Sequence, residues 1–260
     1  MPHDATRAAR EPSGALDAPW LSVIVPLYDE GPTLEASLQR LLAWLQRSGH
    51  SWELLLIDDA SRDATRATAD DFVARHPQLP LRCAHHPRNT GRGRVVRDGL
   101  AAARGQVAGY LDIDLEVAED ALGPCLAALS GGADVAVGRR RYALEPHSLL
   151  RHVLSRGYSR LVRALLGTRL RDTESGCKWF RMTSIAPLLP RLVHDGWFFD
   201  TEIMMRAERA GLAIAEVPVE FRRRFDKTST VRPLRDSLAY LGALLRFRLS
   251  LWREDRRAAR

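Results

Sequence analysis

Residues 21–58 read LSVIVPLYDEGPTLEASLQRLLAWLQRSGHSWELLLID, an apolar run, a stretch with leucines at helical spacing, and a second apolar run. Short runs of branched apolar residues predict strands that are buried on both faces, and apolar residues recurring every three or four positions predict an amphipathic helix, here over Thr33–Arg47. Two such strands joined by such a helix are typical of a parallel βαβ unit.

The same alternation continues toward the C-terminus. Helices are expected over residues 63–75, 93–104 and 119–129, and strands at WELLLI, LRCAHH, QVAGYL and DVAVG. The sequence therefore predicts an α/β fold with a mostly parallel central sheet flanked by helices. Beyond Arg139 the pattern is looser, with helices expected near residues 149–166 and 201–210, a strand at AIAEVPVEF, and a final helix over residues 233–252.

Composition indicates one globular domain, because 45% of the 260 residues are hydrophobic and no internal repeat divides the chain. We expect a disordered lead-in over residues 1–19, the folded domain over 20–232, and a basic amphipathic helix over 233–260. The three cysteines are far apart and form no CxxC pair, so neither a disulfide framework nor a structural zinc site is expected. Together with the lack of an apolar segment of spanning length, this favours a reducing cytoplasmic location.

The formal net charge of +7 suits a polyanion, an anionic bilayer or a phosphorylated substrate. The sequence disfavours a nucleic-acid-binding module. Acidic strand ends would repel backbone phosphates, and no interleaving of aromatic and basic residues occurs.

Acidic residues follow three of the expected strands at the point where each strand ends. They are Asp29 and Glu30 after Tyr28, the pair Asp58 and Asp59, and the alternating Asp112, Asp114 and Glu116. The carboxyl ends of parallel strands meet at one edge of a sheet, where ligands of such folds bind. Crowded carboxylates repel one another unless a cation joins them, and oxygen ligands at D-x-D spacing suit Mg²⁺ or Mn²⁺. The alternative is a set of solvated turns in which each acid caps the next helix.

The segments VPLYDE, LLIDDASRDAT, HPRNTGRGRVVRDGL and YLDIDLE resemble, in order and spacing, the family 2 glycosyltransferases. Further along, DTESGCKWF, FFDTEIMMRAERAG and EVPVEFRRR resemble the branch that makes polyprenyl-phosphate sugars, the dolichyl-phosphate mannose and glucose synthases. The resemblance covers about residues 21–225. It implies the nucleotide-sugar-binding fold called GT-A, a GDP- or UDP-sugar donor and a polyprenyl phosphate acceptor.

The resemblance also implies roles for individual residues. The nucleoside would be contacted by Pro26, Tyr28, Glu30, Asp58 and Asp59. The metal would be held by Asp112 and Asp114 as the D-x-D pair, with Glu116 at a position where the branch commonly has Gln. Arg140 and Arg156 would bind the phosphate of the acceptor. Arg224 and Ser229 would bind the diphosphate of the donor. The branch has a lysine where this chain has Thr230. Either Lys227 takes the place of that lysine, or the donor diphosphate is bound less tightly.

The acceptor decides the chemistry that this resemblance implies. A polyprenyl phosphate arrives ionised and attacks the anomeric carbon without a general base, with inversion of configuration. A hydroxyl acceptor would need a base, for which the candidates are Asp172, Glu174, Asp200 and Glu202. A homologue that binds nucleotide sugars without turning them over is a third possibility.

Two further segments have alternative interpretations. The glycine-rich NTGRGR could cradle a phosphate before a helix, but it matches neither dinucleotide nor P-loop patterns, so Gly91 and Gly93 are expected only to permit a tight helix entry. The final helix mixes leucines with arginines, which suits either an interfacial helix on anionic lipid or a helix packed on the core. We expect peripheral attachment to the inner face of the membrane, directly or through a membrane-protein partner.

Overall fold

The computed structural model describes residues 18–142, 157, 160–222 and 233–258. Its centre is a seven-stranded sheet in the order β3-β2-β1-β4-β6-β5-β7. The strands are β1 (Leu21–Leu27), β2 (Trp52–Asp58), β3 (Leu81–His85), β4 (Val107–Leu111), β5 (Val135–Tyr142), β6 (Cys177–Arg181) and β7 (Ile214–Phe221).

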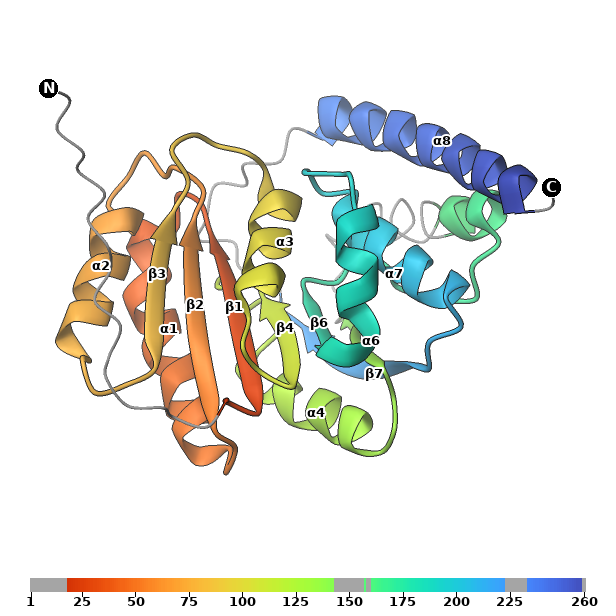
Figure 1. The fold of residues 1–260 in the computed structure, drawn as a ribbon. Helices are drawn as coiled ribbons and strands as arrows, with labels where there is room; N and C mark the ends of the chain where they lie inside the picture. The colour runs from red at the N-terminus through yellow and green to blue at the C-terminus, as the bar shows by residue number, and fades with distance from the viewer. Residues whose placement is uncertain (1–17, 143–156, 158–159, 223–232, 259–260) are drawn as a thin grey trace, which may run out of the picture.

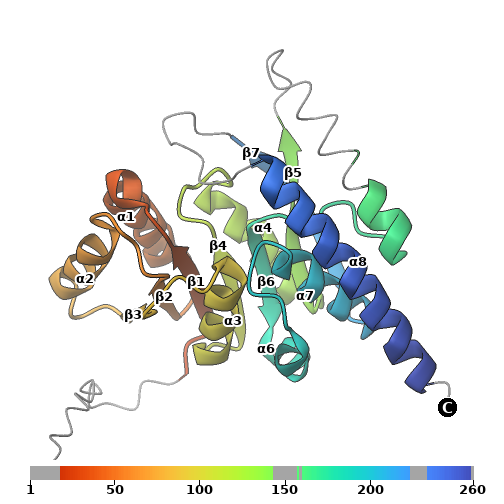
Figure 2. The same cartoon turned by 90° about the horizontal axis from the view of Figure 1, so that it is seen from above.

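Helices cover both faces of this sheet (Figure 1). One face packs against α1 (Gly31–Arg47), α2 (Thr65–Arg75) and α4 (Leu122–Ser130), which follows the 3-10 turn η1 (Glu119–Ala121). The other packs against α3 (Arg92–Ala102), α6 (Met182–Ile185), the 3-10 segment η3 (Ala186–Arg191) and α7 (Phe199–Arg209). The long helix α8 (Pro233–Ala258) lies outside these layers, against α7 and the helical residues 160–166 (Figure 2).

The apolar runs of the sequence are continuous because the central strands are buried on both faces. In β1, Val23 and Val25 join the cluster formed with the leucines of α1, whereas Ile24 joins the cluster formed with α3 and α7. Pro26 has no N–H to donate, and it lies in register with Ile57 of β2 where the ladder to β4 has already ended.

The prediction of a mostly parallel sheet is confirmed, with one strand of opposite direction. Strands β1, β2, β3 and β4 are mutually parallel, as are β5 and β7. Strand β6 runs antiparallel between β4 and β5 and was not predicted. Its sequence, CKWFR, is short and carries a lysine, yet Trp179 and Phe180 fill the cores on opposite sides of the sheet.

Several boundaries differ from those expected. Helix α1 begins at Gly31, since Pro32 stands in its first turn and suits a helix start. Helix α8 continues to Ala258, and β5 extends through Arg140 to Tyr142. The helix expected near residues 149–166 is described only at residues 157 and 160–166. No helix in the described ranges has the length and apolar character needed to cross a bilayer.

Candidate active site

The carboxyl ends of β2, β1 and β4 lie side by side, as the sequence predicted. Just beyond each strand, one non-glycine residue has a left-handed backbone: Asp29 at φ 53°, Ala60 at φ 60° and Leu115 at φ 52°. Each such residue costs about 1–3 kcal/mol, and such residues cluster at functional sites. The edge that gathers the acidic residues is therefore also where strained backbone is concentrated.

Hydrogen bonds join the loop after β1 to the loop after β2. The Asp29 N–H donates to Ser61 Oγ at 3.0 Å, and the Asp29 carboxylate accepts from the Arg62 N–H at 2.8 Å. The Glu30 N–H donates to Thr65 Oγ1 at 2.6 Å. These contacts fix the backbone beside Tyr28, which is half-buried, and explain why a short polar sequence forms an ordered edge.

Asp58 and Asp59 are both buried and hold neighbouring loops. Asp58 accepts the Ser61 N–H at 3.2 Å. Asp59 accepts from the N–H groups of Thr90 and Gly91, each at 2.8 Å, and from His86 Nδ1 at 2.9 Å. Burial alone would raise the pKa of Asp59, but these hydrogen bonds outweigh it and hold the pKa below its usual value. A role of the two acids in binding the nucleoside stays a prediction.

Gly91 begins α3 in a conformation that only glycine adopts easily. Its φ is 98°, and a Cβ built there would lie 2.5 Å from the carbonyl oxygen of Asp195. The bond from Asp59 to its N–H anchors the same point. The interpretation of this glycine-rich segment as a tight helix entry accounts for these contacts.

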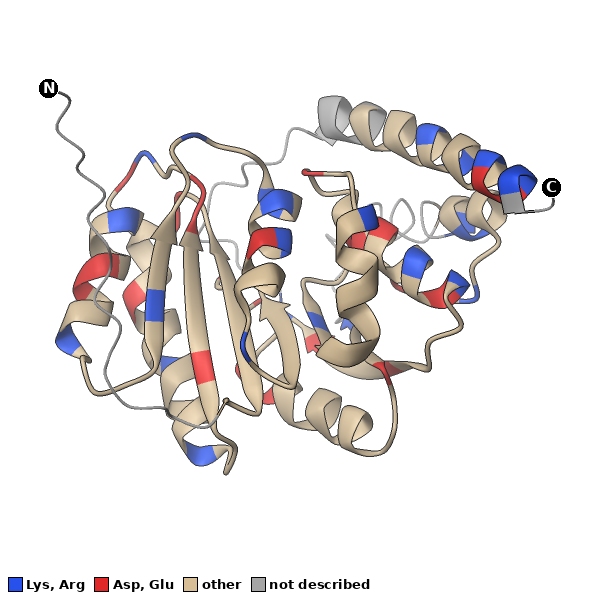
Figure 3. Ribbon diagram, in the orientation of Figure 1, with Lys and Arg blue, Asp and Glu red and all other residues tan. Residues whose placement is uncertain are grey.

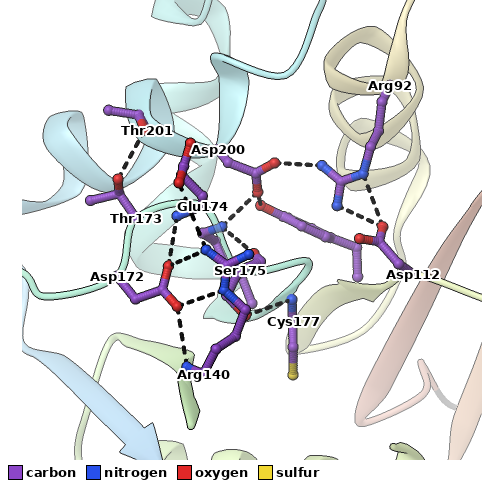
Figure 4. Close-up of polar contacts among 12 residues, drawn as sticks. Arg92, Asp112, Arg140, Asp172, Thr173, Glu174, Ser175, Cys177, Asp200 and Thr201 are labelled. Atoms are coloured by element: carbon purple, nitrogen blue, oxygen red, sulfur yellow. Dashed lines mark hydrogen bonds and ion pairs between the residues drawn. The ribbon is translucent and has the colours of Figure 1, made fainter. Parts of the chain in front are cut away.

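Arg92, the next residue, joins two acids of the site (Figure 4). Its Nε and Nη2 donate to Asp112 Oδ1 at 2.9 and 2.7 Å, and its Nη1 donates to Asp200 at 2.5 Å. Burial, reinforced by the nearby Asp114 and Asp200, raises the pKa of Asp112 to about 6 in spite of this arginine.

Asp112 also lies against a glycine. A Cβ at Gly176 would be 1.8 Å from Asp112 Oδ2, so any side chain at position 176 would displace the carboxylate. The Asp112 N–H donates to the Gly176 carbonyl at 3.2 Å. The turn before β6 therefore packs directly against the end of β4, and its glycine leaves the space that the Asp112 carboxylate occupies.

Asp200, at the start of α7, is the centre of a buried polar cluster. It accepts from Arg92, from the Tyr110 hydroxyl at 2.5 Å and from Lys178 Nζ at 2.6 Å. Lys178 is fully buried, and burial lowers its pKa. Burial alone would raise the pKa of Asp200, but its three donors hold the pKa below its usual value.

Of the four carboxylates considered as bases, three are held ionised. Asp200 is the first. Asp172 accepts hydrogen bonds from Arg140 through both carboxylate oxygens, at 2.8 and 2.9 Å. Glu202 accepts hydrogen bonds from the Val193 and His194 N–H groups. In each, contacts outweigh burial and lower the pKa. Glu174 is different, because burial, reinforced by Asp172 and Asp200, raises its pKa to about 7 despite the nearby Arg140.

Arg140, predicted to grip the acceptor phosphate, is the partner of Asp172 (Figure 4). Its backbone N–H also donates to Asp172, at 3.1 Å. The other phosphate-binding candidates, Arg156, Arg224 and Ser229, lie outside the described residues together with Lys227 and Thr230.

The carboxylates that follow β4 are ligands of the type that a hard divalent cation prefers, and their role in holding one stays a prediction. Asp112, Asp114 and Glu116 offer carboxylate oxygens on alternate residues at one strand end, and the Asp114 carboxylate accepts the Glu116 N–H at 3.2 Å. Burial raises the pKa of Asp112, and the neighbouring charges of Asp114 and Asp200 add to this effect. A bound Mg²⁺ or Mn²⁺ would favour the ionised form of these carboxylates.

Some residues of the site escaped the sequence analysis. Arg92, Tyr110 and Lys178 were not named as candidates, although all three stand inside quoted motifs. The signal that could have found Lys178 is a lysine between apolar residues, in a segment short enough to be a buried strand, where a charge needs a partner.

Comparisons with known proteins agree with this architecture. The family model described as "Glycosyl transferase family 2" matches residues 22–189. The chain is 32% identical to glycosyltransferase AglD of Haloferax volcanii over 87% of this chain and 36% of that protein. It is 31% identical to the dolichyl-phosphate beta-glucosyltransferase of Drosophila melanogaster over 77% of this chain and 66% of that protein. It thus spans about a third of one relative and just under two thirds of the other.

Solved structures share the fold. Glucosyl-3-phosphoglycerate synthase from Mycobacterium tuberculosis, in complex with UDP, aligns with a TM-score of 0.65 at 20% identity, covering 89% of this chain and 79% of that one. The mannosyltransferase PcManGT of Pyrobaculum calidifontis, in complex with GDP-Man and Mn²⁺, aligns with a TM-score of 0.54 at 20% identity, covering 78% and 56%. With the family model matching most of its length, this chain belongs to glycosyl transferase family 2 and has the GT-A fold.

Proposed function

We propose that this chain transfers a sugar from a nucleotide-sugar donor, a GDP- or UDP-sugar, to a polyprenyl phosphate. Its relatives named for dolichyl-phosphate glucosylation support this acceptor. The observation that carries it is that Asp172, Asp200 and Glu202 are held ionised with lowered pKa values, which makes them weak bases. An acceptor that arrives as an anion needs no base.

The donor would lie across the ends of β2, β1 and β4. Pro26, Tyr28, Glu30, Asp58 and Asp59 would surround the nucleoside, with the last two holding the loops that shape its pocket. Asp112, Asp114 and Glu116 would hold Mg²⁺ or Mn²⁺, which when bound offsets the charge of the diphosphate leaving group.

The protein's own contribution to the reaction is alignment and charge. Arg140 and Arg156 would hold the acceptor phosphate in line with the anomeric carbon, and Arg224 with Ser229 would hold the donor diphosphate. For Arg140 this requires the phosphate to share or replace Asp172 at the guanidinium. Attack opposite to the leaving group inverts the anomeric carbon.

A hydroxyl acceptor is the second candidate, and Glu174 is the observation that favours it. With a pKa raised to about 7, Glu174 is poised to take a proton near neutral pH. It lies 3.8 Å from Arg140, so a phosphorylated acceptor carrying a hydroxyl could meet both groups.

Helix α8 supports a membrane location. Its inner face, Ala243, Leu244, Phe247 and Leu251, packs on the domain, whereas Leu241, Leu245, Leu249 and Trp252 are exposed along one stripe. Arginines recur along its C-terminal half (Figure 3). The inner face accounts for packing on the core, and the outer stripe would rest peripherally on anionic lipid at the cytoplasmic face, directly or beside a membrane-protein partner.

The experiment that tests the function is incubation with a panel of radiolabelled nucleotide sugars and short polyprenyl phosphates, followed by partition into organic solvent. Label in the organic phase supports the proposal and identifies both substrates. Label only in water-soluble products supports the hydroxyl acceptor. Tight nucleotide-sugar binding without any turnover identifies a non-catalytic homologue.

A further inference from the structure

On the far side of the sheet from the polar cluster around Asp200, a second group of potential ligands connects α2 with the edge strand β3. Asp70, Cys83 and His85 each offer one ligand atom, and these atoms lie within 4.8 Å of one another. His85 Nε2 is 2.8 Å from Asp70 Oδ1 and 3.7 Å from Cys83 Sγ. Figure 1 shows α2 lying alongside β3.

The fold, rather than the spacing of cysteines, brings these atoms together. Cys83 and His85 are two residues apart on one strand, so both side chains point to the same face of the sheet, the face covered by α2. Asp70 is on the exposed surface of α2. A search for CxxC pairs does not find such a group, because one ligand is a carboxylate from a different element.

The other nitrogen of His85 provides an independent observation. Nδ1 is buried and makes no hydrogen bond within the part of the chain that the structure describes, but it faces the fully buried carboxylate of Asp58 at 3.6 Å. Asp58 and His85 are partners in the register of β2 and β3. A histidine whose second nitrogen faces a carboxylate is the usual arrangement around a protein-bound metal, since the carboxylate fixes the ring and its tautomer.

From this geometry we propose that Asp70, Cys83 and His85 form a binding site for Zn²⁺, with Asp58 orienting His85. Thiolate sulfur, imidazole nitrogen and a carboxylate oxygen form a ligand set that suits zinc and not Mg²⁺. Asp70 is exposed, so water completes the coordination. On binding, the Cys83 thiol loses its proton to solvent as the sulfur–metal bond forms.

The surroundings of Cys83 favour a cation. Two carboxylates border the cluster, Asp70 at 2.8 Å and Asp58 at 3.6 Å from the His85 ring nitrogens, with Arg66 as a weaker opposing charge near Cys83. The region is therefore negative, which a divalent ion would neutralise. The site would join α2 to the exposed edge of the sheet, next to the loop that Asp58 holds.

Cobalt(II) is the probe for this site, because a thiolate ligand gives Co²⁺ a sulfur-to-metal band in the near ultraviolet that carboxylate ligands do not give. Metal-free protein titrated with Co²⁺ should show this band at one equivalent, and Zn²⁺ should abolish it by displacement. The band should be lost in Cys83→Ser and unchanged in Asp114→Asn, which alters only the D-x-D pair.

Affinity measurements separate the ligands from their neighbours. Asp58→Asn should weaken Zn²⁺ binding by about 10- to 100-fold, as loss of an orienting partner does. Asp70→Asn should weaken it at least as much, whereas Asp71→Asn, the adjacent exposed acid paired with Arg75, is the matched control and should leave it unchanged. No band in the wild-type protein, a band that survives Cys83→Ser, or equal effects of Asp70→Asn and Asp71→Asn would each overturn the proposal.

Discussion

Arg92 shows how one guanidinium can organise a site. It is about nine-tenths buried and divides its donors between Asp112 and Asp200. Removing one member of a buried ionic group leaves the others without compensation, which costs more than the contact itself contributes.

Arg92→Ala should therefore lower the free energy of unfolding by about 3–5 kcal/mol. Arg92→Lys should recover part of this loss, because a point charge cannot bridge both carboxylates in the same way. Urea denaturation measures both. The matched control is Arg94→Ala on the same helix, whose exposed pair with Asp98 is worth no more than about 1 kcal/mol. Equal losses for the two alanine variants would contradict the role given to Arg92.

Glu174 predicts a pH dependence of stability. Its pKa rises from the usual 4.5 to about 7 on folding, so between these values the folded state binds more protons than the unfolded state. The contribution of Glu174 to the stability of the fold is fully present below about pH 4.5 and is lost as the pH rises toward 7. In the wild-type protein the free energy of unfolding should fall by an amount on the order of 2 kcal/mol across this pH range, and Glu174→Gln should remove that fall. Unfolding measured at several pH values checks this.

Glu220→Gln is the control for this titration, since Glu220 is exposed and pairs with Arg222 at the surface. The interpretation fails if the wild-type and Glu174→Gln curves stay parallel between pH 4.5 and 7. The same variant separates the acceptor classes, because transfer to a polyprenyl phosphate should survive it and transfer to a hydroxyl should not.

The acids at the end of β4 predict a requirement for metal. Activity should need Mg²⁺ or Mn²⁺ and disappear in Asp114→Ala with the fold retained, while Glu116→Gln should weaken metal binding because it removes a charge and keeps the shape. Metal titrations of transfer activity, with circular dichroism for the fold, provide the measurement. Asp120→Ala, an exposed acid just beyond, should leave the titration unchanged. Full transfer in excess chelator would contradict the assignment.

At the scale of elements, α8 offers two faces that can be tested separately. Leu245→Glu with Leu249→Glu should reduce sedimentation with anionic vesicles and change stability little, because both side chains are exposed. Leu244→Ala on the inner face should instead lower the free energy of unfolding by about 2–5 kcal/mol. Vesicle binding that is unchanged in the double variant would show that the outer stripe does not meet lipid.

The elements that could be predicted are those in which the apolar residues follow a single pattern, typical of either a buried strand or an amphipathic helix. Strands β1, β2 and β4 contain the apolar runs VIV, LLLI and VAGYL because helices bury both faces, so the sequence alone locates them. Strand β6 could not be found in this way. Lys178 interrupts its apolar pattern, and the buried lysine is compensated by Asp200, which is far away in the sequence.

At the scale of the whole molecule, the acidic edge was predictable because parallel strands place their carboxyl ends together. The sequence did not predict which charged side chains form ion pairs with one another. In a chain with 39 lysines and arginines, the sequence does not distinguish the buried Arg92 from its solvated neighbours, and Arg140 could be assigned a phosphate but not its partner Asp172. Which charges meet depends on how segments more than a hundred residues apart approach one another, as Arg92 and Asp200 do.

The antiparallel strand β6 has a consequence for how the chain is made. During synthesis, β1 to β4 emerge as a parallel half-sheet whose last strand, β4, exposes an unpaired hydrogen-bonding edge until residues 177–181 arrive. The first aspartate of the D-x-D pair cannot adopt its final geometry before then, because Gly176 shapes the space around it. We therefore expect this non-local pairing to close the sheet late in synthesis, and a nascent chain to be most open to edge-to-edge association before the pairing forms.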